Sequence, residues 1–270
     1  MAVNWVDRVP TRANRVLVTP EDGGAAYYAT ITRADEPSVV GTPINAANLN
    51  AMQNAAGLTE SKAIYVSTTG SDTAGTGAQS APYATIRKAL STFPRNLNGY
   101  TAVIHIAAGT YAEAVNITGY GNGVLRFSGV AGDVVNISGL TISNVQFMEI
   151  ENISISMPNG FLYIVGSNLR VFSTMSMSGG QYGMHATFFA SVAFMETVTV
   201  SNTSSAAILA TSCATVYVQS LQGSGNAVAV HSLRGSICSI GTNGSTATTL
   251  YQTGTGGRIY SGAQSQIPNY

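Results

Sequence analysis

A repeat of about 22 residues in the second half of the chain restricts the possible folds more than any other feature. In each repeat a turn rich in Gly, Asn and Ser precedes a short apolar strand. These strands are expected to begin near Leu140, Leu162, Met184, Ile208, Val228 and Leu250. The intervals between these positions are nearly constant. A period of this length without a helical pattern indicates a coil of β-strands.

Two further apolar strands are expected in each repeat. The second strand contains Phe147, Leu169, Val192, Val216, Ile237 and Ile259, and the third contains Ile153, Met175, Val198 and Leu221. In the third strand, apolar residues two positions apart share one face, which is the period of a half-buried strand. Three short strands per repeat, joined by tight bends, predict an all-β chain folded as a parallel β-helix. One turn of such a coil cannot bury its apolar face alone, whereas stacked turns bury a continuous column.

The chain carries little charge, and that charge is unevenly distributed. Charged residues make up 9% of the sequence, the formal net charge is +0, and 16 of the 24 charged residues lie in the first 120 positions. Phosphate binding requires clustered Lys and Arg, so we expect no nucleic-acid partner. An apolar content of 45% together with a fixed period favours a packed fold over disorder. Strands with so little charge also favour association between copies.

The N-terminus and the cysteines are typical of a protein made in the cytoplasm. The first residues lack a basic start followed by an apolar core, so no secretory signal is predicted. No uncharged apolar run reaches the roughly 18 residues of a membrane span, and no membrane insertion is expected. Cys213 and Cys238 occupy different positions within their repeats, which predicts two thiols without a disulfide.

Residues 1–40 form a separate unit with a different composition. Residues 15–20 and 26–32 are expected to be strands joined by the turn Glu-Asp-Gly-Gly, which predicts a β-hairpin. The unit contains Trp5, the only tryptophan of the chain. It is too small to bury a core of its own, so we expect it to fold against a partner or against its own copies.

Residues 41–58 predict a short helix. Thr42 suits the N-cap, Pro43 the first helical position and Gly57 the C-cap. A narrow apolar stripe along this helix includes Ile44, Leu49 and Met52. A short helix of this kind is marginal alone and suits a bundle of identical copies, so a homotrimer is predicted.

The run Thr-Pro-Ile-Asn-Ala-x-Asn-Leu-Asn at residues 42–50 resembles a segment near the N-terminus of tail-fibre and baseplate-associated proteins of phages of Gram-positive bacteria. In that family the segment precedes a trimeric stalk or a receptor-binding domain. The resemblance implies a virion protein, with residues 1–40 as the virion-anchoring unit and other phage structural proteins as partners. The anchoring or oligomerisation residues that it implies are Trp5, Ile44, Leu49 and Met52.

Residues 59–123 contain a second resemblance. Tyr-Val-Ser-x-x-Gly-Ser-Asp at residues 65–72, Ala-Pro-Tyr-Ala-Thr-Ile at 81–86 and Ile-Ala-Ala-Gly-Thr-Tyr at 106–111 together are similar to the entrance cap of pectate-lyase-like β-helices. This resemblance implies a right-handed parallel β-helix, with residues 124–270 as its turns and C-terminal cap. Within the entrance cap we expect strands near residues 63–67 and 102–106 and a helix over residues 81–90. Such caps occur in enzymes and adhesins alike, so the fold does not supply a function.

The candidate catalytic residues are Glu149, Glu151 and Arg170. A polysaccharide lyase or glycosidase on this scaffold needs paired carboxylates, or a carboxylate with Arg or Lys, on one exposed strip. Glu149 and Glu151 are two residues apart and share a face, while Arg170 follows Glu149 by about one repeat. A surface ion pair is the favoured interpretation, because Glu196 lies several positions further along its repeat and no other acid matches the offset.

No metal or cofactor site is predicted. His185 and His231 lie two repeats apart with no acidic residue at the same offset between them. Asp72 has no neighbouring carboxylates, so a role in a turn is favoured over calcium binding. We interpret one set of aromatic residues as groups for core and inter-subunit packing rather than a sugar-binding platform: Tyr182, Phe188, Phe189, Phe194 and Tyr217.

Together these patterns predict a phage virion protein without a cofactor. The expected role is a tail fibre or receptor-binding appendage that attaches to the particle by its N-terminus and directs the β-helix at a glycan of the host surface. One alternative is a capsid decoration or head-fibre protein. A second alternative is a polysaccharide depolymerase that uses the acidic candidates on the β-helix.

Overall fold

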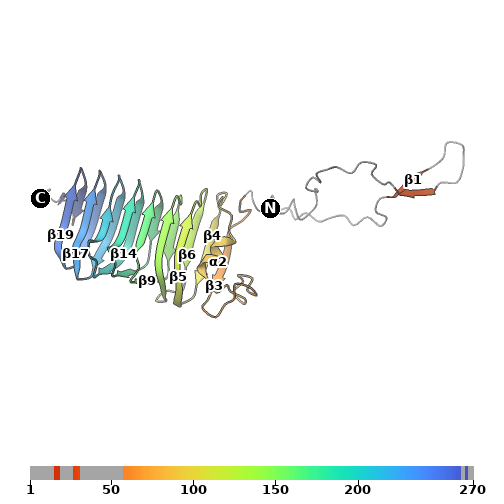
Figure 1. Cartoon of the computed structure of the whole chain (residues 1–270), viewed down its shortest axis with the longest axis horizontal. Helices are drawn as coiled ribbons and strands as arrows, with labels where there is room; N and C mark the ends of the chain where they lie inside the picture. The colour runs from red at the N-terminus through yellow and green to blue at the C-terminus, as the bar shows by residue number, and fades with distance from the viewer. Residues whose placement is uncertain (1–14, 19–26, 31–56, 263–264, 267–270) are drawn as a thin grey trace. The chain divides into compact units, whose positions relative to one another are not determined.

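A computed structural model describes residues 15–18, 27–30, 57–262 and 265–266 of the chain (Figure 1). The chain divides into two units, Met1–Ala56 and Gly57–Tyr270. In the first unit, β1 (Arg15–Val18) and β2 (Tyr27–Thr30) pair antiparallel, which confirms the predicted hairpin. Trp5 and the helix predicted from residue 41, with Ile44, Leu49 and Met52, lie outside the described residues.

The second unit is a coil of short parallel strands arranged on three faces. The first face contains the C-terminal halves of β5 (Gly109–Thr118) and β7 (Val134–Ser143), followed by β10 (Leu162–Val165), β13 (Tyr182–Thr187), β15 (Ala206–Ala210), β17 (Asn226–Leu233) and β19 (Ala247–Gly254). The second face contains β3 (Lys62–Val66), β4 (Thr101–Ile106), β6 (Val124–Ser128), β8 (Met148–Glu151), β11 (Asn168–Val171), the N-terminal halves of β14 (Ser191–Ser201) and β16 (Thr215–Gln222), β18 (Ile237–Asn243) and β20 (Arg258–Ser261). The third face contains β9 (Ser154–Pro158) and β12 (Met175–Ser178), together with the remaining halves of β5, β7, β14 and β16 and the last residues of β18.

The register of the first face confirms the parallel β-helix. One inward-facing residue from each turn stacks on the next: Val115, Leu140, Leu162, Met184, Ile208, Val230 and Tyr251. The interval between successive members varies by only a few positions along the column. Among the described strands of this unit, the only antiparallel pair is β20 with β21 (Ser265–Gln266). Figure 1 shows the strands stacked in chain order from β3, in orange, to β19, in blue.

Strands are present near Val228 and Leu250, as predicted, but neither residue stacks in the column that contains Ile208. The residue that stacks on Ile208 is Val230, two positions after the predicted Val228, and the next member is Tyr251 instead of Leu250. Leu250 is 48% exposed. Because side chains alternate along a strand, a shift of one residue turns an expected core residue to the outside.

A shift of one residue also occurs on the second face. Met148 and Cys238 are the buried residues that stack with Leu169 and Val216, so the predicted Phe147 and Ile237 are each one position early. On the third face, Met175 stacks on Ile155, two positions after the predicted Ile153, although Ile153 is also buried. Apolar residues therefore occur on both sides of these strands. Their order along the chain does not determine which of two neighbouring residues points into the core, and we call this choice the phase of the strand.

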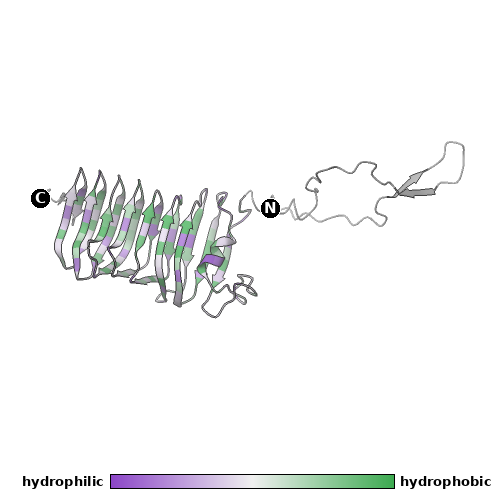
Figure 2. Ribbon diagram, in the orientation of Figure 1, coloured by the Kyte–Doolittle hydropathy of each residue, from purple (hydrophilic) through white to green (hydrophobic). Residues whose placement is uncertain are grey.

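The core is one continuous apolar column inside the coil. Its largest fully buried side chains include Tyr120, Phe127 and Phe194. Hydrophobic and hydrophilic residues alternate along the strands, as Figure 2 shows. Inward-facing side chains of successive turns pack on one another, and this packing holds the turns together in addition to the parallel hydrogen-bond ladders.

The entrance of the coil is covered by a short helix, α2 (Ile86–Ser91). The helix is shorter than the predicted segment 81–90, because Thr85 is its N-cap and Tyr83 instead bridges to Val66 of β3. Its buried residues are Ile86, Ala89 and Leu90, the apolar face that the sequence indicates. None of the helices in the described ranges is long and apolar enough to cross a membrane.

Candidate functional site

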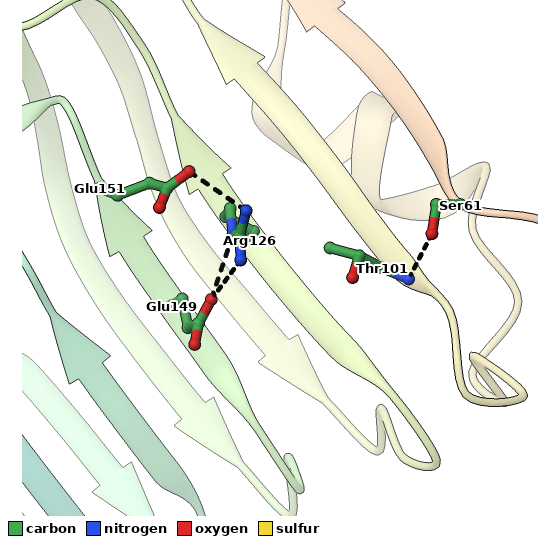
Figure 3. Close-up of polar contacts among 5 residues, drawn as sticks. All are labelled: Ser61, Thr101, Arg126, Glu149 and Glu151. Carbon is green, nitrogen blue, oxygen red and sulfur yellow. Dashed lines mark hydrogen bonds and ion pairs between the residues drawn. The ribbon is translucent and has the colours of Figure 1, made fainter.

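The three catalytic candidates lie on the second face, where an arginine that sequence reasoning did not pair with them binds both carboxylates. Arg126 of β6 donates to Glu149 Oε2 of β8 from Nη2 at 2.7 Å and from Nε at 3.1 Å. Its Nη1 lies 3.3 Å from Glu151 Oε1. Figure 3 shows the guanidinium between the two carboxylates. The side chains of Arg126, Glu149 and Glu151 are half-buried on the outer surface of neighbouring strands.

Arg170 lies beside Glu149 in the next turn, as predicted, but it does not form the expected ion pair with Glu149. It is the partner of Glu149 across the β8–β11 pairing, one turn beyond Arg126. Among the described residues it forms no ion pair, and its side chain is exposed. Both carboxylates bind the guanidinium of Arg126, so this cluster is a surface ion-pair network rather than two acids that face each other across a cleft. Ion pairs of this kind typically contribute about 0–1 kcal/mol.

Asp72 and Glu113 hold the start of α2. Asp72 Oδ1 accepts from the amides of Ala84 and Thr85 at 2.8 and 3.0 Å, and its Oδ2 accepts from Thr85 Oγ1 at 2.6 Å. Burial raises the pKa of Asp72, but the hydrogen bonds from Thr85 and Ala84 outweigh it and lower the pKa below its usual value. This agrees with the predicted turn role of Asp72.

Glu113 is a structural acid that sequence reasoning missed. It is 8% exposed and accepts from the amides of Ile86 at 2.7 Å and Arg87 at 3.1 Å. These amides belong to the first turn of α2, where backbone donors have no partner within the helix. Within the described ranges no group of three or more His, Cys, Asp or Glu side chains is arranged to hold a metal ion.

His185 and His231 occupy one outward column of the first face. His185 stacks on Tyr163 and Leu209, and Leu209 stacks on His231, so the two imidazoles are separated by one turn. Burial lowers the pKa of His185 and of His231 below their usual values. Both rings are therefore neutral at pH 7, since an unperturbed histidine has a pKa of about 6.5.

The aromatic residues singled out in the sequence have different environments. Phe194 is fully buried, in agreement with core packing, whereas Phe188, Phe189 and Tyr217 are exposed in the single chain. Phe188 and Phe189 both adopt positive φ, 52° and 60°, in the bend between β13 and β14. Tyr182 alone joins a group of rings, and this group is the most promising candidate site on the β-helix.

This aromatic groove has a volume of about 450 Å³ and lies across two neighbouring turns of the first face. It is lined by Phe161, Tyr163, Gly180, Gln181, Tyr182 and His185. Phe161 and Tyr163 have ring centroids 6.5 Å apart, and those of Tyr163 and His185 are 5.2 Å apart. The Tyr182 ring lies 5.6 Å from that of His185. The rings form a continuous aromatic surface without a formal charge.

The alternation of β10 and β13 produces this surface. Leu162 and Ile164 point into the core, so Tyr163 points outward, and the register places it beside His185 of the next turn. The interval from Tyr163 to His185 equals one repeat and could have predicted that the two residues are neighbours. In the sequence, we applied this interval only to the inward-facing apolar residues. The bend before β13 contains Gly179 and Gly180, which adopt φ of +73° and +76°, a conformation that favours glycine.

We assign the tautomer of His185 from the hydroxyl next to its Nε2. The Thr211 hydroxyl donates to Thr187 Oγ1 at 2.8 Å, so we assign it as the acceptor of the 3.2 Å contact with His185 Nε2. Nδ1 is then an acceptor, and no side chain or backbone group in the described ranges hydrogen-bonds to it. The groove therefore combines aromatic surface with an imidazole acceptor, two phenol hydroxyls and one carboxamide.

Two other grooves on the described surface are lined by residues with structural roles, and a third, of about 530 Å³, is lined by residues of three consecutive turns, among them Thr203, Asn226 and Thr246. One is lined by Asp72, Arg87, Lys88 and Glu113 around the start of α2, which these acids already hold. Another, of about 270 Å³, is lined in part by Tyr65 and His105, whose rings stack with centroids 4.8 Å apart. None of the grooves described here is lined by Glu149, Glu151 or Arg170.

Comparisons with models of known protein families, with curated proteins and with solved structures found no match to this chain.

Proposed function

We propose that this protein is a structural component of a phage particle, an appendage that binds a glycan of the host surface without cleaving it. Its N-terminal unit attaches to other virion proteins, the helix predicted over residues 41–58 associates three copies, and the β-helix presents the binding surface. The phage assignment depends on the resemblance of residues 42–50 to tail-fibre and baseplate-associated proteins. The β-helix fold is compatible with this role and with many others.

One structural observation favours binding over cleavage. The carboxylates of Glu149 and Glu151 are both bound by Arg126, and neither lines the aromatic groove. Glycoside hydrolysis requires two carboxyl groups on either side of the scissile bond. The surface with the best geometry for a sugar therefore lacks the acids that hydrolysis needs.

The first test locates the protein and measures its attachment to cells. Antibody-gold labelling of intact particles should place the chain on the tail, and a fluorescent fusion of the full chain should bind cells of the host. Labelling of the head would contradict the tail assignment in favour of a capsid decoration. A fusion that binds no host cell would contradict the receptor-binding role.

The second test addresses catalysis and assembly. Incubation of the full chain with purified capsule or teichoic-acid preparations should release no reducing ends and no unsaturated-sugar absorbance. Either product would show that the protein is a depolymerase. Light scattering should give the mass of a trimer, and Leu49→Asp should reduce it to that of a monomer. A monomeric full chain at micromolar concentration would exclude the trimer.

A further inference from the structure

The aromatic groove has the chemistry of a site for an uncharged sugar. Its floor contains Phe161, Tyr163 and Tyr182, whose rings offer apolar surface to solvent, and Phe161 is 49% exposed. A cluster of exposed rings on a charge-poor protein is costly in water, because apolar surface is most stable when it is covered. Tyr163 of β10 and His185 of β13 are register partners in the parallel ladder, which fixes their spacing, and Phe161 directly precedes β10.

The polar groups at the groove restrict the ligand further. His185 Nδ1 accepts, the hydroxyls of Tyr163 and Tyr182 donate or accept, and the Gln181 amide does both. No formal charge lines the groove, and His185 is neutral at pH 7 because burial lowers its pKa. A charged ligand would therefore lose its hydration there without gaining an opposite charge.

A pyranose ring matches these properties. Its C–H groups give it an apolar face that can cover an aromatic ring, and its rim carries hydroxyls that pair with neutral donors and acceptors. The groove, at about 450 Å³, falls within the range of small-molecule sites and can hold one or two sugar rings. Pockets of this kind combine mostly apolar walls with a few polar groups that orient the ligand.

We propose that the groove formed by Phe161, Tyr163, Gln181, Tyr182 and His185 binds a neutral glycan, with a sugar ring packed on the aromatic side chains and hydroxyls paired with His185 and Gln181. This site deepens the proposed function, on which its biological role rests. The binding chemistry itself depends only on the geometry of β10, β13 and the residues directly before each strand.

The experiment titrates the full chain with neutral hexasaccharides of glucose, galactose, mannose and N-acetylglucosamine, and with hexagalacturonate as the charged comparison, by calorimetry and NMR. At least one neutral probe should bind, and hexagalacturonate should bind at least 10-fold more weakly than that probe. Tyr163→Ala and Phe161→Ala should each weaken binding about 10-fold, which corresponds to about 1.4 kcal/mol, within the range of one aromatic contact. Phe172→Ala is the matched control, because Phe172 is 42% exposed and lies outside the groove.

Several outcomes would overturn the site. These are no binding of any neutral probe at 10 mM, tighter binding of hexagalacturonate, or equal losses in the Tyr163→Ala and Phe172→Ala variants. A change in oligomeric mass in Tyr163→Ala, with circular dichroism unchanged, would show instead that the groove is a contact between copies. Host-cell binding distinguishes the two proposals: cells bound equally by wild type and Tyr163→Ala would overturn the groove alone, whereas sugar binding without cell binding would overturn the appendage role alone.

Discussion

The two ends of the β-helix unit are built differently. At the entrance, α2 buries Ile86, Ala89 and Leu90 against the first turns, and the acids that hold its start are themselves part of the coil or its first loop. At the far end, within the described part of the chain, β19 has no buried residue, and only Ala247 and Tyr251 pack partly on the core. The described apolar column is therefore covered by a helix at the entrance, whereas on the first face of the last turn its side chains are only partly buried.

This difference indicates where the coil is weakest. In a coil each turn contacts only its neighbours, so stability is approximately a sum of contributions from the turns and from the interfaces between them. The entrance turns have interfaces on both sides, one of them with α2. Among the described strands, the last turn on the first face pairs with β17 on one side only. We therefore expect unfolding to begin at the far end, with amides of β19 exchanging faster than those of β6 and β8.

The largest effect is expected from truncating the apolar column in its middle. Leu140→Ala should lower the free energy of unfolding by about 2–5 kcal/mol, since Leu140 is 1% exposed and stacks between Val115 and Leu162. Tyr251→Ala, at the same column position in the last turn, should cost less. Urea unfolding followed by circular dichroism measures both. Equal losses would show that the far end is as tightly packed as the middle.

A smaller loss is expected from releasing the entrance helix. Glu113→Ala leaves the amides of Ile86 and Arg87 without their acceptor, which should cost about 1–3 kcal/mol. Glu149→Ala removes an acid from the outer surface and should cost about 0–1 kcal/mol. The comparison is made by thermal unfolding of the two variants. A Glu149→Ala protein that is the less stable of the two would reverse the roles assigned to these acids.

The pH dependence should separate two groups of residues. The folded state lowers the pKa of His185 and His231, so the unfolded chain takes up these protons first as the pH falls. Stability from the neutral imidazoles is complete above about pH 6.5 and declines below it. The double variant His185→Gln, His231→Gln should have a flatter stability profile between about pH 6.5 and 5. A profile with the wild-type slope in that interval would contradict the burial of both rings.

Asp72 should act in a lower pH interval. Its folded pKa is below the ordinary value, so its contribution is present above about pH 3.9 and is lost as the pH falls further. Asp72→Asn should be less stable than wild type at pH 7, and this difference should shrink towards pH 3. Unfolding in urea at the two pH values measures the change. A constant difference would mean that Asp72 stabilises α2 without its charge.

The smallest perturbation is thiol labelling. The rate at which Cys238 is labelled measures how often β18 opens, and the stability of the last turns is not changed. Both cysteines are unpaired, as the sequence predicts, with Cys213 exposed and Cys238 buried. Burial raises the pKa of Cys238 to about 12, so at pH 8 Cys213 should react with a thiol reagent quickly and Cys238 only when β18 opens. Cys213→Ser isolates that slow reaction. Fast labelling of Cys238 in this variant would show that the last turns are open in the native state.

The sequence by itself determined the class and the period of this fold. Alternating apolar residues identify strands locally, and their nearly constant spacing from repeat to repeat requires that successive turns stack. The hairpin at residues 15–32, the strands beside the entrance helix and the thiol state of both cysteines follow from equally local patterns.

Tertiary structure decided the phase of the strands and the partners of the outward residues. The bends between the first and second faces differ in the number of residues with positive φ: Asn144 and Gly166 stand alone, whereas Phe188–Phe189 and Ser212–Cys213 occur as pairs. In addition, β14 has a register shift between Phe194 and Thr197. Each extra residue shifts the inward-facing positions of all later strands by one residue. Neither the longer bends nor the register shift can be recognised from the pattern of apolar residues.

Outward partners depend on that phase. Glu149 has an arginine one turn before it and another one turn after it, and only the conformations of the folded side chains select Arg126 over Arg170. The aromatic groove likewise exists because the register places Tyr163 beside His185, while a bend containing Gly179 and Gly180 brings Tyr182 to the same surface. Local pattern specifies which residues face outward, but the stacking of one turn on the next specifies which of them meet.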